Sequence, residues 1–540
     1  MPTSTGLDHG SKLRWLRRAL SLVTLPVLTI GLLAAVPAAA DPSPGQSHGG
    51  DTPASELVRT RQGEVNGVTT GASEQFLGLP YAAPPVRELR FAPPAPPAAW
   101  KGVRAADRQS PACLQFQPSG VREEQAVSEY CLYLDVYRPA EIGKDERLPV
   151  MVWFHGGGNT QGTGVIYGGG TLAAKTRSIV VTINYRLGAL GFLAHPALSA
   201  VTPGGSGNYA LMDQRASLQW VQENIAAFGG NADNVTIFGQ SAGGGAVCNM
   251  LALPSARGLF DRAIIESSAC FNSTSTTLVA AEAGGVKYAK AIGCTDAATV
   301  VACLRKAWPG TLIAHQGEYV GGAKVASGFL PLAFPDALAK GTWNRVPIMT
   351  GTTRSEDRLT SQNQAGITAA GVEQFVRRTY PDKAAKVLAR YPLSAFQSPY
   401  DQLTQVTTDA GRACKTELTA RATTGEVPTY RYEFDDPTSP TLYGFELPGE
   451  DMSNAHSAEL QYLFDFTLGA KPLTATQERL SDQVMRYWGS FAHHGDPNFS
   501  GAPSWPQYGP QQNVMSLRPG GKSTAIRNFS AEHHCDFWLS

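Results

Sequence analysis

Five apolar runs rich in β-branched residues recur along the chain, with helical stretches between them. The runs cover residues 148–154, 178–185, 234–238, 262–267 and 346–351. Between the second and third runs, apolar residues repeat at the spacing of one helical face, at Leu211, Leu218, Val221, Ile225 and Phe228. Strands that alternate with helices usually form a parallel sheet covered by helices on both faces. The pattern therefore predicts an α/β fold.

Two long stretches between the strand candidates are mostly helical in pattern, at about residues 275–345 and 360–425. Neither is bounded by a linker of the kind that separates domains. We interpret them as insertions that build walls over the sheet. Residues 57–540 are therefore expected to form a single domain.

Residues 1–40 have the pattern of a secretory signal peptide. Four basic residues precede an apolar stretch at 20–36, and three alanines at 38–40 stand before Asp41. We expect cleavage before Asp41, export of the mature protein to the extracellular space, and a flexible leader at 41–56. An uncleaved membrane anchor is the alternative, and Arg17-Arg18 leaves both the Sec and the Tat export routes open.

The charge balance of the mature chain excludes no small-molecule function but gives no reason to expect nucleic acid. The full chain has 45 Lys and Arg against 45 Asp and Glu, and removing the four basic residues and one acidic residue of the signal peptide leaves 41 against 44. After residue 40 there is no apolar stretch of about 20 residues, so the mature protein should not span a membrane. The oligomeric state does not follow from the sequence.

Eight cysteines in an exported chain favour disulfides over metal binding or redox chemistry, and none lies in a CxxC motif. Local spacing is compatible with links from Cys113 to Cys131 and from Cys294 to Cys303. Four cysteines are then left for longer links: Cys248, Cys270, Cys414 and Cys535. Spacing alone does not determine the pairing.

Ser241 lies between Gly239 and Gly243 in the stretch IFGQSAGG, directly after the strand candidate 234–238. An Ala- and Gly-rich helix candidate begins at Ala242. This strand-turn-helix setting is typical of a nucleophile elbow, which holds a serine hydroxyl out over the sheet. Ser241 is therefore a candidate nucleophile, and a structural serine in a glycine-rich turn is the alternative.

A second glycine-rich turn follows the strand candidate 148–154, in the stretch FHGGGN. Backbone N–H groups in such a turn can bind a developing oxyanion. We expect Gly157 and Gly158, together with Ala242, to be the three donors, while a turn without a ligand is the alternative. His155 is interpreted as a residue that positions this loop rather than as a catalytic one.

These stretches belong to a series of motifs that resembles the type-B carboxylesterases, the group of α/β-hydrolases that includes the cholinesterases. From about residue 58 to the C-terminus the series includes FLGLPYAAPP, SEYCLYLDVYRP, FHGGGN, INYRLGALGFL, GNYALMDQ, VTIFGQSAGG, HSAELQYLF and CDFW. The resemblance implies an α/β-hydrolase fold with a mostly parallel central sheet. It also implies a serine esterase that acts on small-molecule esters.

The resemblance selects two further residues. Glu356 in GTTRSEDR stands where the family has its catalytic acid, and His456 in NAHSAELQYLF stands where the family has its catalytic histidine. The order Ser241, Glu356, His456 is that of an α/β-hydrolase. Asp357 replaces a glycine of the family pattern and stays a competing acid. On order alone, the pairs at 493–494 and 533–534 could also supply the histidine.

The chemistry implied is acyl transfer without a metal or organic cofactor. His456 would take the proton of Ser241, Glu356 would orient the imidazole, and the three backbone N–H groups would bind the oxyanion. A lipase or a polyester hydrolase on the same fold is the nearest alternative. A non-catalytic binding protein, as among some cholinesterase-like adhesion proteins, is a more distant one.

The resemblance also implies three disulfides. These are Cys113 with Cys131, Cys294 with Cys303, and Cys414 with Cys535. Cys248 and Cys270 match no family pair, so they form either a fourth link or two small buried apolar side chains.

Overall fold

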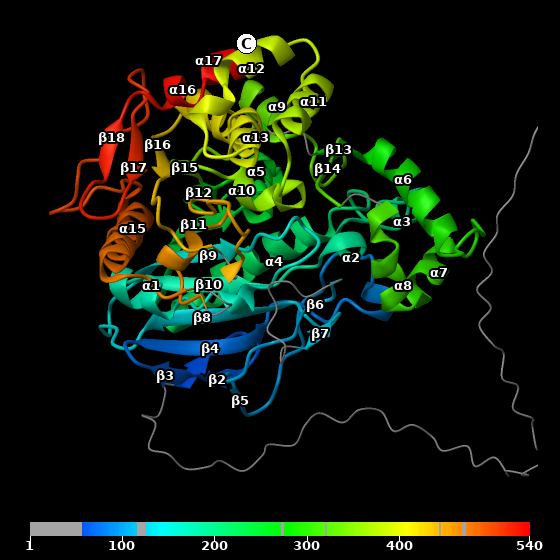
Figure 1. Cartoon of the computed structure of the whole chain (residues 1–540). Coiled ribbons are helices and arrows are strands. Elements are labelled where there is room, and N and C mark those ends of the chain that lie inside the picture. The colour runs from blue at the N-terminus through cyan, green and yellow to red at the C-terminus, as the bar shows by residue number, and fades with distance from the viewer. Residues whose placement is uncertain (1–56, 116–125, 272–274, 319–320, 442–443, 467–470) are drawn as a thin grey trace, which may run out of the picture. The chain divides into compact units, whose positions relative to one another are not determined.

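The structure is a computed structural model that describes residues 57–115, 126–271, 275–318, 321–441, 444–466 and 471–540 (Figure 1). The predicted signal peptide at 1–40 and the leader at 41–56 lie outside these residues. All the described residues belong to the same compact unit of the chain.

Eleven strands form the central sheet. In chain order they are β3 (Val68–Thr70), β4 (Ser73–Pro80), β8 (Tyr133–Pro139), β9 (Leu148–Phe154), β10 (Ile179–Ile183), β11 (Gly230–Gln240), β12 (Arg262–Glu266), β15 (Ile348–Thr353), β16 (Thr429–Phe434), β17 (Val514–Leu517) and β18 (Thr524–Ile526). Their order across the sheet is β18-β17-β16-β15-β12-β11-β9-β10-β8-β4-β3. Pairing is parallel from β17 to β10 and antiparallel at both edges. The predicted α/β fold is confirmed.

Three smaller sheets complete the strands of the described chain. One joins β1 (Leu57–Arg59), β2 (Glu64–Asn66) and β5 (Val103–Ala105). The others pair β6 (Ala112–Cys113) with β7 (Val127–Ser128) and β13 (Thr276–Thr277) with β14 (Lys324–Val325).

The five predicted runs correspond to the five adjacent parallel strands β9, β10, β11, β12 and β15. Such strands contain long apolar runs because both faces of the sheet are covered. The main difference is at β11, which begins four residues before the predicted 234–238 run and ends two residues after it. An irregular register between Gly230 and Val235 allows this longer pairing with β9.

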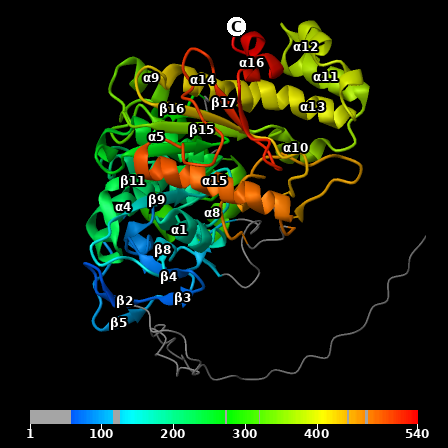
Figure 2. The same ribbon diagram turned by 90° about the vertical axis from the view of Figure 1, so that its left-hand side faces the viewer.

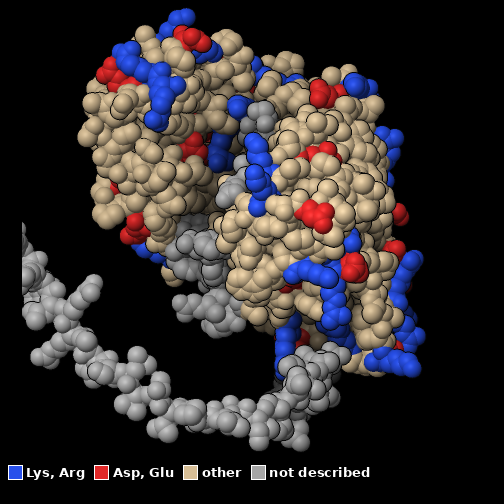
Figure 3. All heavy atoms as spheres, turned by 90° about the vertical axis from the view of Figure 1, so that its right-hand side faces the viewer, with Lys and Arg blue, Asp and Glu red and all other residues tan. Residues whose placement is uncertain are grey.

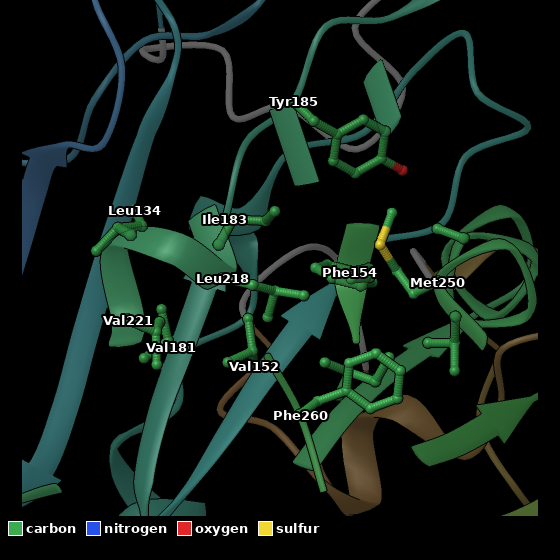
Figure 4. Packing of buried hydrophobic residues seen from close by; sticks show 14 of the residues in the cluster. Leu134, Val152, Phe154, Val181, Ile183, Tyr185, Leu218, Val221, Met250 and Phe260 are labelled. Carbon is green, nitrogen blue, oxygen red and sulfur yellow. The ribbon is translucent and has the colours of Figure 1, made fainter. Parts of the chain in front are cut away.

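Helices pack on both faces of this sheet, and β9 shows how. Val152 and Phe154 lie in one buried cluster with residues of α4 (Tyr209–Asn224) and α5 (Ala242–Ala252), as Figure 4 shows for Leu218 and Met250. Trp153 points to the opposite face, into a cluster with α1 (Gly170–Thr176) and α15 (Ala475–His494). Figure 2 shows α15 running across that face. Alternating side chains of one strand thus fill two cores.

The predicted insertions are helical. The first contains α6 (Leu278–Ala291), α7 (Val300–Lys306), α8 (Pro309–Ala314) and α9 (Phe334–Ala339). The second contains α11 (Ala369–Thr379), α12 (Ala384–Arg390), α13 (Pro399–Thr408) and α14 (Cys414–Thr423). The remaining short helices are α2 (Gly188–Phe192), α3 (Pro196–Ser199), α10 (Asp357–Thr360), α16 (Phe529–Glu532) and α17 (Cys535–Trp538). Figures 1 and 2 place α11 and α12 beside the C-terminal helices.

Four disulfides link parts of the fold. Three are the pairs implied by the resemblance: Cys113–Cys131, Cys294–Cys303 and Cys414–Cys535. The fourth joins Cys248 to Cys270, which settles the pairing that the sequence left open. All eight cysteines lie in the described chain, and none of them is free. Four disulfides are typical of a protein that folds in an oxidising compartment.

Two further features of the described chain are the apolar character of its helices and the distribution of charged residues on its surface. Within the described ranges, no helix has both the length and the apolar character needed to cross a bilayer. On the face shown in Figure 3, residues other than Lys, Arg, Asp and Glu cover most of the surface, and the charged residues lie scattered among them.

Candidate active site

Ser241 lies in the turn between β11 and α5. Its backbone has φ 58° and ψ −121°, an unfavourable conformation for a residue with a side chain. Two backbone hydrogen bonds hold this turn: the Ser241 N–H donates to Glu266 O at 2.9 Å, and the Gly245 N–H donates to Ser241 O at 2.9 Å. The structure therefore places Ser241 in the strained turn that the sequence predicted.

The two flanking glycines allow the strand and the helix to approach closely. A Cβ atom at Gly243 would lie 1.9 Å from the carbonyl oxygen of Phe154. One at Gly239 would lie 2.6 Å from the backbone carbon of Gly243. Because neither neighbour is a flexible side chain, any other residue at these positions would displace the turn that carries Ser241.

A cavity of about 670 Å³ opens beside Ser241. Much of its wall is apolar, with contributions from Phe192, Leu211, Val325 and Phe334. Its volume and lining are typical of sites that bind small organic molecules. Another cavity, of about 740 Å³, is lined by residues between 437 and 477 and contains none of the predicted site residues.

His456 and Glu356 form a buried pair at the carboxyl ends of the central strands. Nδ1 of His456 is hydrogen-bonded to Oε2 of Glu356. The backbone N–H of His456 donates to Glu356 O at 3.0 Å, and Oε1 of Glu356 accepts the N–H of Thr353 at 3.0 Å. With Nδ1 donating to a carboxylate, Nε2 of His456 keeps its lone pair and can accept a proton.

The charge on Glu356 is maintained by its neighbours. Burial by itself raises the pKa of this carboxyl group, but His456 and Arg412 more than offset that effect, so its pKa lies below the usual value. Glu356 is therefore a carboxylate at neutral pH. As a carboxylate it accepts a hydrogen bond and stabilises a positive charge on His456.

Asp357, the competing acid, has other partners. Its Oδ1 accepts hydrogen bonds from Arg412 Nε at 3.0 Å and from Thr360 Oγ1 at 2.6 Å. No hydrogen bond of the described residues joins Asp357 to His456. The geometry therefore pairs His456 with Glu356 rather than with Asp357.

The alternative histidines also have other partners. His493 Nε2 lies 2.8 Å from the carbonyl oxygen of Thr176. His533 lies between Asp409 and Glu433, with ring nitrogens 2.5 Å and 2.7 Å from their carboxylate oxygens. Burial lowers the pKa of His533, but these two carboxylates raise it to about 9. A protonated imidazole with both nitrogens engaged has no lone pair with which to act as a base.

His155 has the properties of a loop-positioning residue. Its ring stacks on that of Tyr185, with centroids 4.3 Å apart, and its Nδ1 lies 2.7 Å from Gly156 O. The Tyr185 hydroxyl donates to the carbonyl oxygen of His155 at 2.6 Å. Burial lowers the pKa of His155 to about 4, so the ring is neutral and fixed beneath the glycine-rich turn.

The three predicted oxyanion donors lie at or beside the cavity. Gly158 and Ala242 line it together with Ser241, and Gly157 directly precedes Gly158 in the turn. Gly157 has a φ of 107°, and a Cβ atom there would lie 2.0 Å from the carbonyl oxygen of Gln161. Only glycine fits this position without strain.

The structure does not bring Ser241 and His456 into a hydrogen bond among the described residues. The neighbouring Gln240 contacts His456 instead, with its Nε2 3.3 Å from Nε2 and 3.5 Å from Nδ1 of the ring. A nitrogen in the ring plane at these distances would collide with a ring carbon, so the amide lies over the ring face. In free enzymes, catalytic hydrogen bonds are often longer than in complexes with substrate. For Gln240, the only sequence signal was its place beside Ser241.

Two buried acids behind Ser241 were not singled out from the sequence. Burial raises the pKa of Glu266 to about 8, and its Oε1 accepts the indole N–H of Trp488 at 2.7 Å. Burial, together with Glu356 and Glu266, raises the pKa of Glu459 well above its usual value, and Ser267 Oγ donates to it at 3.1 Å. Burial therefore makes the ionised form of either carboxyl group unfavourable in the folded protein.

In the part of the chain that the structure describes, no group of three or more His, Cys, Asp and Glu residues is arranged to hold a metal ion.

Comparisons with known proteins agree with this geometry. Residues 54–538 match the sequence model of the carboxylesterase family. The chain is 32% identical to cocaine esterase of Homo sapiens over 527 residues, which cover 91% of this chain and 92% of that protein. It is 33% identical to fumonisin B1 esterase of Sphingopyxis macrogoltabida over 482 residues, 86% of each chain.

Solved structures show the same relationship. A PNB esterase superposes with a TM-score of 0.75 at 29% identity and covers 89% of this chain and 98% of its own. A second structure of a PNB esterase superposes with a TM-score of 0.74 at 30% identity. This chain is an enzyme of the carboxylesterase family and has the α/β-hydrolase fold.

Proposed function

We propose that this protein is a secreted serine esterase that hydrolyses carboxylic esters through an acyl-enzyme on Ser241. The observation that carries the proposal is the buried His456–Glu356 hydrogen bond at the same edge of the sheet as the strained Ser241 turn. A serine hydroxyl is a weak nucleophile without a base, and an imidazole oriented by a carboxylate is the usual one.

In the first half of the reaction, an ester binds in the cavity with its carbonyl carbon next to Ser241 Oγ. His456 Nε2 accepts the hydroxyl proton as Oγ bonds to the carbonyl carbon, and Glu356 stabilises the imidazolium that forms. The carbonyl oxygen becomes an oxyanion. When the tetrahedral intermediate collapses, the bond to the alcohol oxygen breaks and His456 returns the proton to the departing alcohol.

Backbone N–H groups stabilise the oxyanion. Gly158 and Ala242 line the cavity and Gly157 directly precedes Gly158, which supports these three N–H groups as donors to the carbonyl oxygen of an ester. In the second half of the reaction, water replaces the alcohol and gives up its proton to His456. The water oxygen bonds to the acyl carbon, and when this second tetrahedral intermediate collapses the bond to Ser241 Oγ breaks. His456 returns the proton to Oγ, and the carboxylic acid leaves. These steps require no metal and no organic cofactor.

Secretion is supported by the sequence and by the disulfides. The signal-peptide pattern of residues 1–40 and the four disulfides both fit an exported protein. N-terminal sequencing of the protein from the culture medium should find a start near Asp41. An intact Met1 on the extracellular protein would contradict this.

The natural ester is a separate question. Cocaine esterase, fumonisin B1 esterase and acylcarnitine hydrolase carry names of different esters, although each is 32–33% identical to this chain. A lipase or polyester hydrolase would prefer emulsified or polymeric esters to soluble ones. A binding protein would hydrolyse neither. Kinetics on soluble, emulsified and polymeric esters separate these three classes.

Ser241→Ala tests the proposal. Removing the nucleophile should lower ester turnover by roughly 10⁴- to 10⁶-fold, since only oxyanion binding would remain. Ser255→Ala is the matched control, because Ser255 is an exposed serine just beyond the other end of α5. If Ser241→Ala retained activity similar to that of the control, the proposal would be wrong.

A further inference from the structure

The Cys248–Cys270 disulfide forms part of the wall of the cavity that contains Ser241. Each of the other three disulfides lies outside this lining. Both cysteines are almost fully buried by the protein, with 5% and 6% of their surface exposed. What remains exposed faces the cavity. A disulfide is apolar and polarisable, so it is suited to contact with an alkyl chain.

Helix geometry fixes how far this disulfide lies from the nucleophile. Ser241, Gly245 and Cys248 follow one another at spacings of four and three residues, which places them on the same face of α5. All three line the cavity. Seven residues at 1.5 Å each correspond to about 10 Å along the helix axis. The disulfide therefore stands about two helical turns from the proposed point of attack.

The other half of the disulfide belongs to a wall that packs against the helical insertions. The Cys270 N–H donates to Thr419 Oγ1 of α14 at 3.1 Å. The next residue, Phe271, contacts Phe334 of α9 edge to face, with ring centroids 6.3 Å apart. Phe271 and Phe334 also line the cavity. The disulfide thus ties the helix that follows Ser241 to the aromatic wall opposite it.

We propose that the Cys248–Cys270 disulfide determines chain-length specificity, because it limits how far an apolar chain of the substrate extends along α5. The inference rests on the proposed function, with Ser241 as the nucleophile. An acetyl group ends well short of the disulfide. A chain of eight or more carbons reaches it. The substrate class is therefore short- to medium-chain apolar esters, with the upper limit set by the two sulfur atoms.

The double variant Cys248→Ala/Cys270→Ala tests this directly. It removes both sulfur atoms from the wall and lengthens the cavity. One methylene in an apolar pocket changes kcat/KM by about 10-fold or more, so the ratio of kcat/KM for p-nitrophenyl decanoate to that for p-nitrophenyl acetate should rise on the order of 10-fold. A parallel series from methyl to decyl acetate reports on a chain at the alcohol side. A length-dependent rise in either series supports the proposal.

The matched control is Cys294→Ala/Cys303→Ala. It removes a disulfide from the same protein, but neither cysteine lines the cavity. The chain-length ratio of this control should stay within about twofold of the wild-type value. An unchanged ratio in Cys248→Ala/Cys270→Ala, or an equal change in both double variants, would overturn the proposal.

Asn249→Phe provides a test with the disulfide intact, and it decides the question if the double variant does not fold. Asn249 also lines the cavity and follows Cys248 on α5. Added bulk at this depth should lower the ratio of kcat/KM for the decanoate to that for the acetate at least fivefold. A ratio equal to the wild-type value would show that long chains do not extend along α5.

Titration with diethyl p-nitrophenyl phosphate separates failure of this inference from failure of the proposed function. Each variant is titrated before the kinetics, and the labelled peptide is identified by mass spectrometry. If the label is absent from Ser241 in the wild type, the proposed function fails. If Ser241 is labelled and the chain-length ratios do not change, only the role of the disulfide fails.

Discussion

Glu266→Gln should stabilise the protein, and the gain should grow with pH. Glu266 ends β12, and its carbonyl oxygen accepts the Ser241 N–H. Its side chain is fully buried, and Oε2 has no hydrogen-bond partner among the described residues. Burial raises its pKa from 4.5 to about 8. The folded protein therefore carries a neutral carboxyl group at a pH where the unfolded chain carries a carboxylate.

The sign and size of the effect follow from proton linkage. Between pH 4.5 and about 8 the folded state binds the proton and the unfolded state does not, so raising the pH lowers the free energy of unfolding. At pH 7 the unfolded carboxyl group is 2.5 units above its pKa of 4.5. At 1.36 kcal/mol for each unit, the loss relative to pH 4.5 is at most about 3 kcal/mol.

The glutamine variant removes this titration while its Oε1 can still accept the Trp488 N–H. Its advantage over the wild type should rise from its value at pH 4.5 by up to about 3 kcal/mol at pH 7. Thermal unfolding of both proteins at pH 5, 6, 7 and 8 measures the trend. Glu478→Gln is the control, because Glu478 is exposed in the first turn of α15. A Tm difference for Glu266→Gln that stays constant or shrinks as pH rises would refute the reasoning.

Three further predictions follow from the same contacts. Glu356→Gln should reduce kcat on the order of 10³-fold or more, whereas Asp357→Asn should change kcat little, because of these two acids only Glu356 is hydrogen-bonded to His456. Steady-state kinetics of both variants measure this, and the reverse order of effects would show that Asp357 is the acid. Gln240→Glu places a carboxylate over the His456 ring, which favours the protonated imidazole. The acid limb of the plot of kcat/KM against pH should therefore move to higher pH by about one unit. An acid limb at the wild-type pH would contradict the contact between residue 240 and the ring. The pairing of protonated His533 with its two carboxylates stabilises the folded protein below the unfolded pKa of 6.5, and this stabilisation is lost as the pH rises through about 9. His533→Gln should therefore lower the free energy of unfolding, measured with denaturant, strongly at pH 6 and much less at pH 9.5. An equal loss at both pH values would disprove the charged pairing.

The central strands could be predicted because buried strands appear in the sequence as runs of apolar residues. Both faces of β9 and β10 are covered, so every residue of these strands is buried and all but Thr182 are apolar. The strands at the two edges of the sheet, β18 and β3, have no such apolar run. Neither β18 nor β3 has a buried residue, and each is only three residues long, so no apolar run or alternation marks them in the sequence. These edges were accordingly absent from the predicted strands.

The candidate site was predictable where local sequence imposes geometry. Gly239 and Gly243 stand two residues before and after Ser241, and close backbone contacts at each exclude a side chain, which leaves a motif in the sequence. The choice of Glu356 over Asp357 had no such local signal and rested on the family resemblance. The two acids are adjacent, and the direction of the chain after β15 decides which one meets His456, a residue 100 positions away.

Contacts between segments that are far apart in the sequence could not be predicted, because they leave no local pattern. The Cys248–Cys270 link depends on where the chain after β12 passes α5, and spacing does not encode that path. The stacking of Gln240 over His456 joins residues 216 positions apart. The pairing of His533 with Asp409 and Glu433 likewise joins residues 124 and 100 positions apart.

Covalent labelling tests the central claim most directly. The wild-type enzyme is incubated with a fluorophosphonate, digested, and the labelled peptide is identified by tandem mass spectrometry, with Ser241→Ala as the parallel sample. The account predicts one phosphonyl group for each active chain, attached to Ser241, with ester hydrolysis lost in proportion to labelling. Loss of activity with the label on another serine, and Ser241 unmodified, would contradict it.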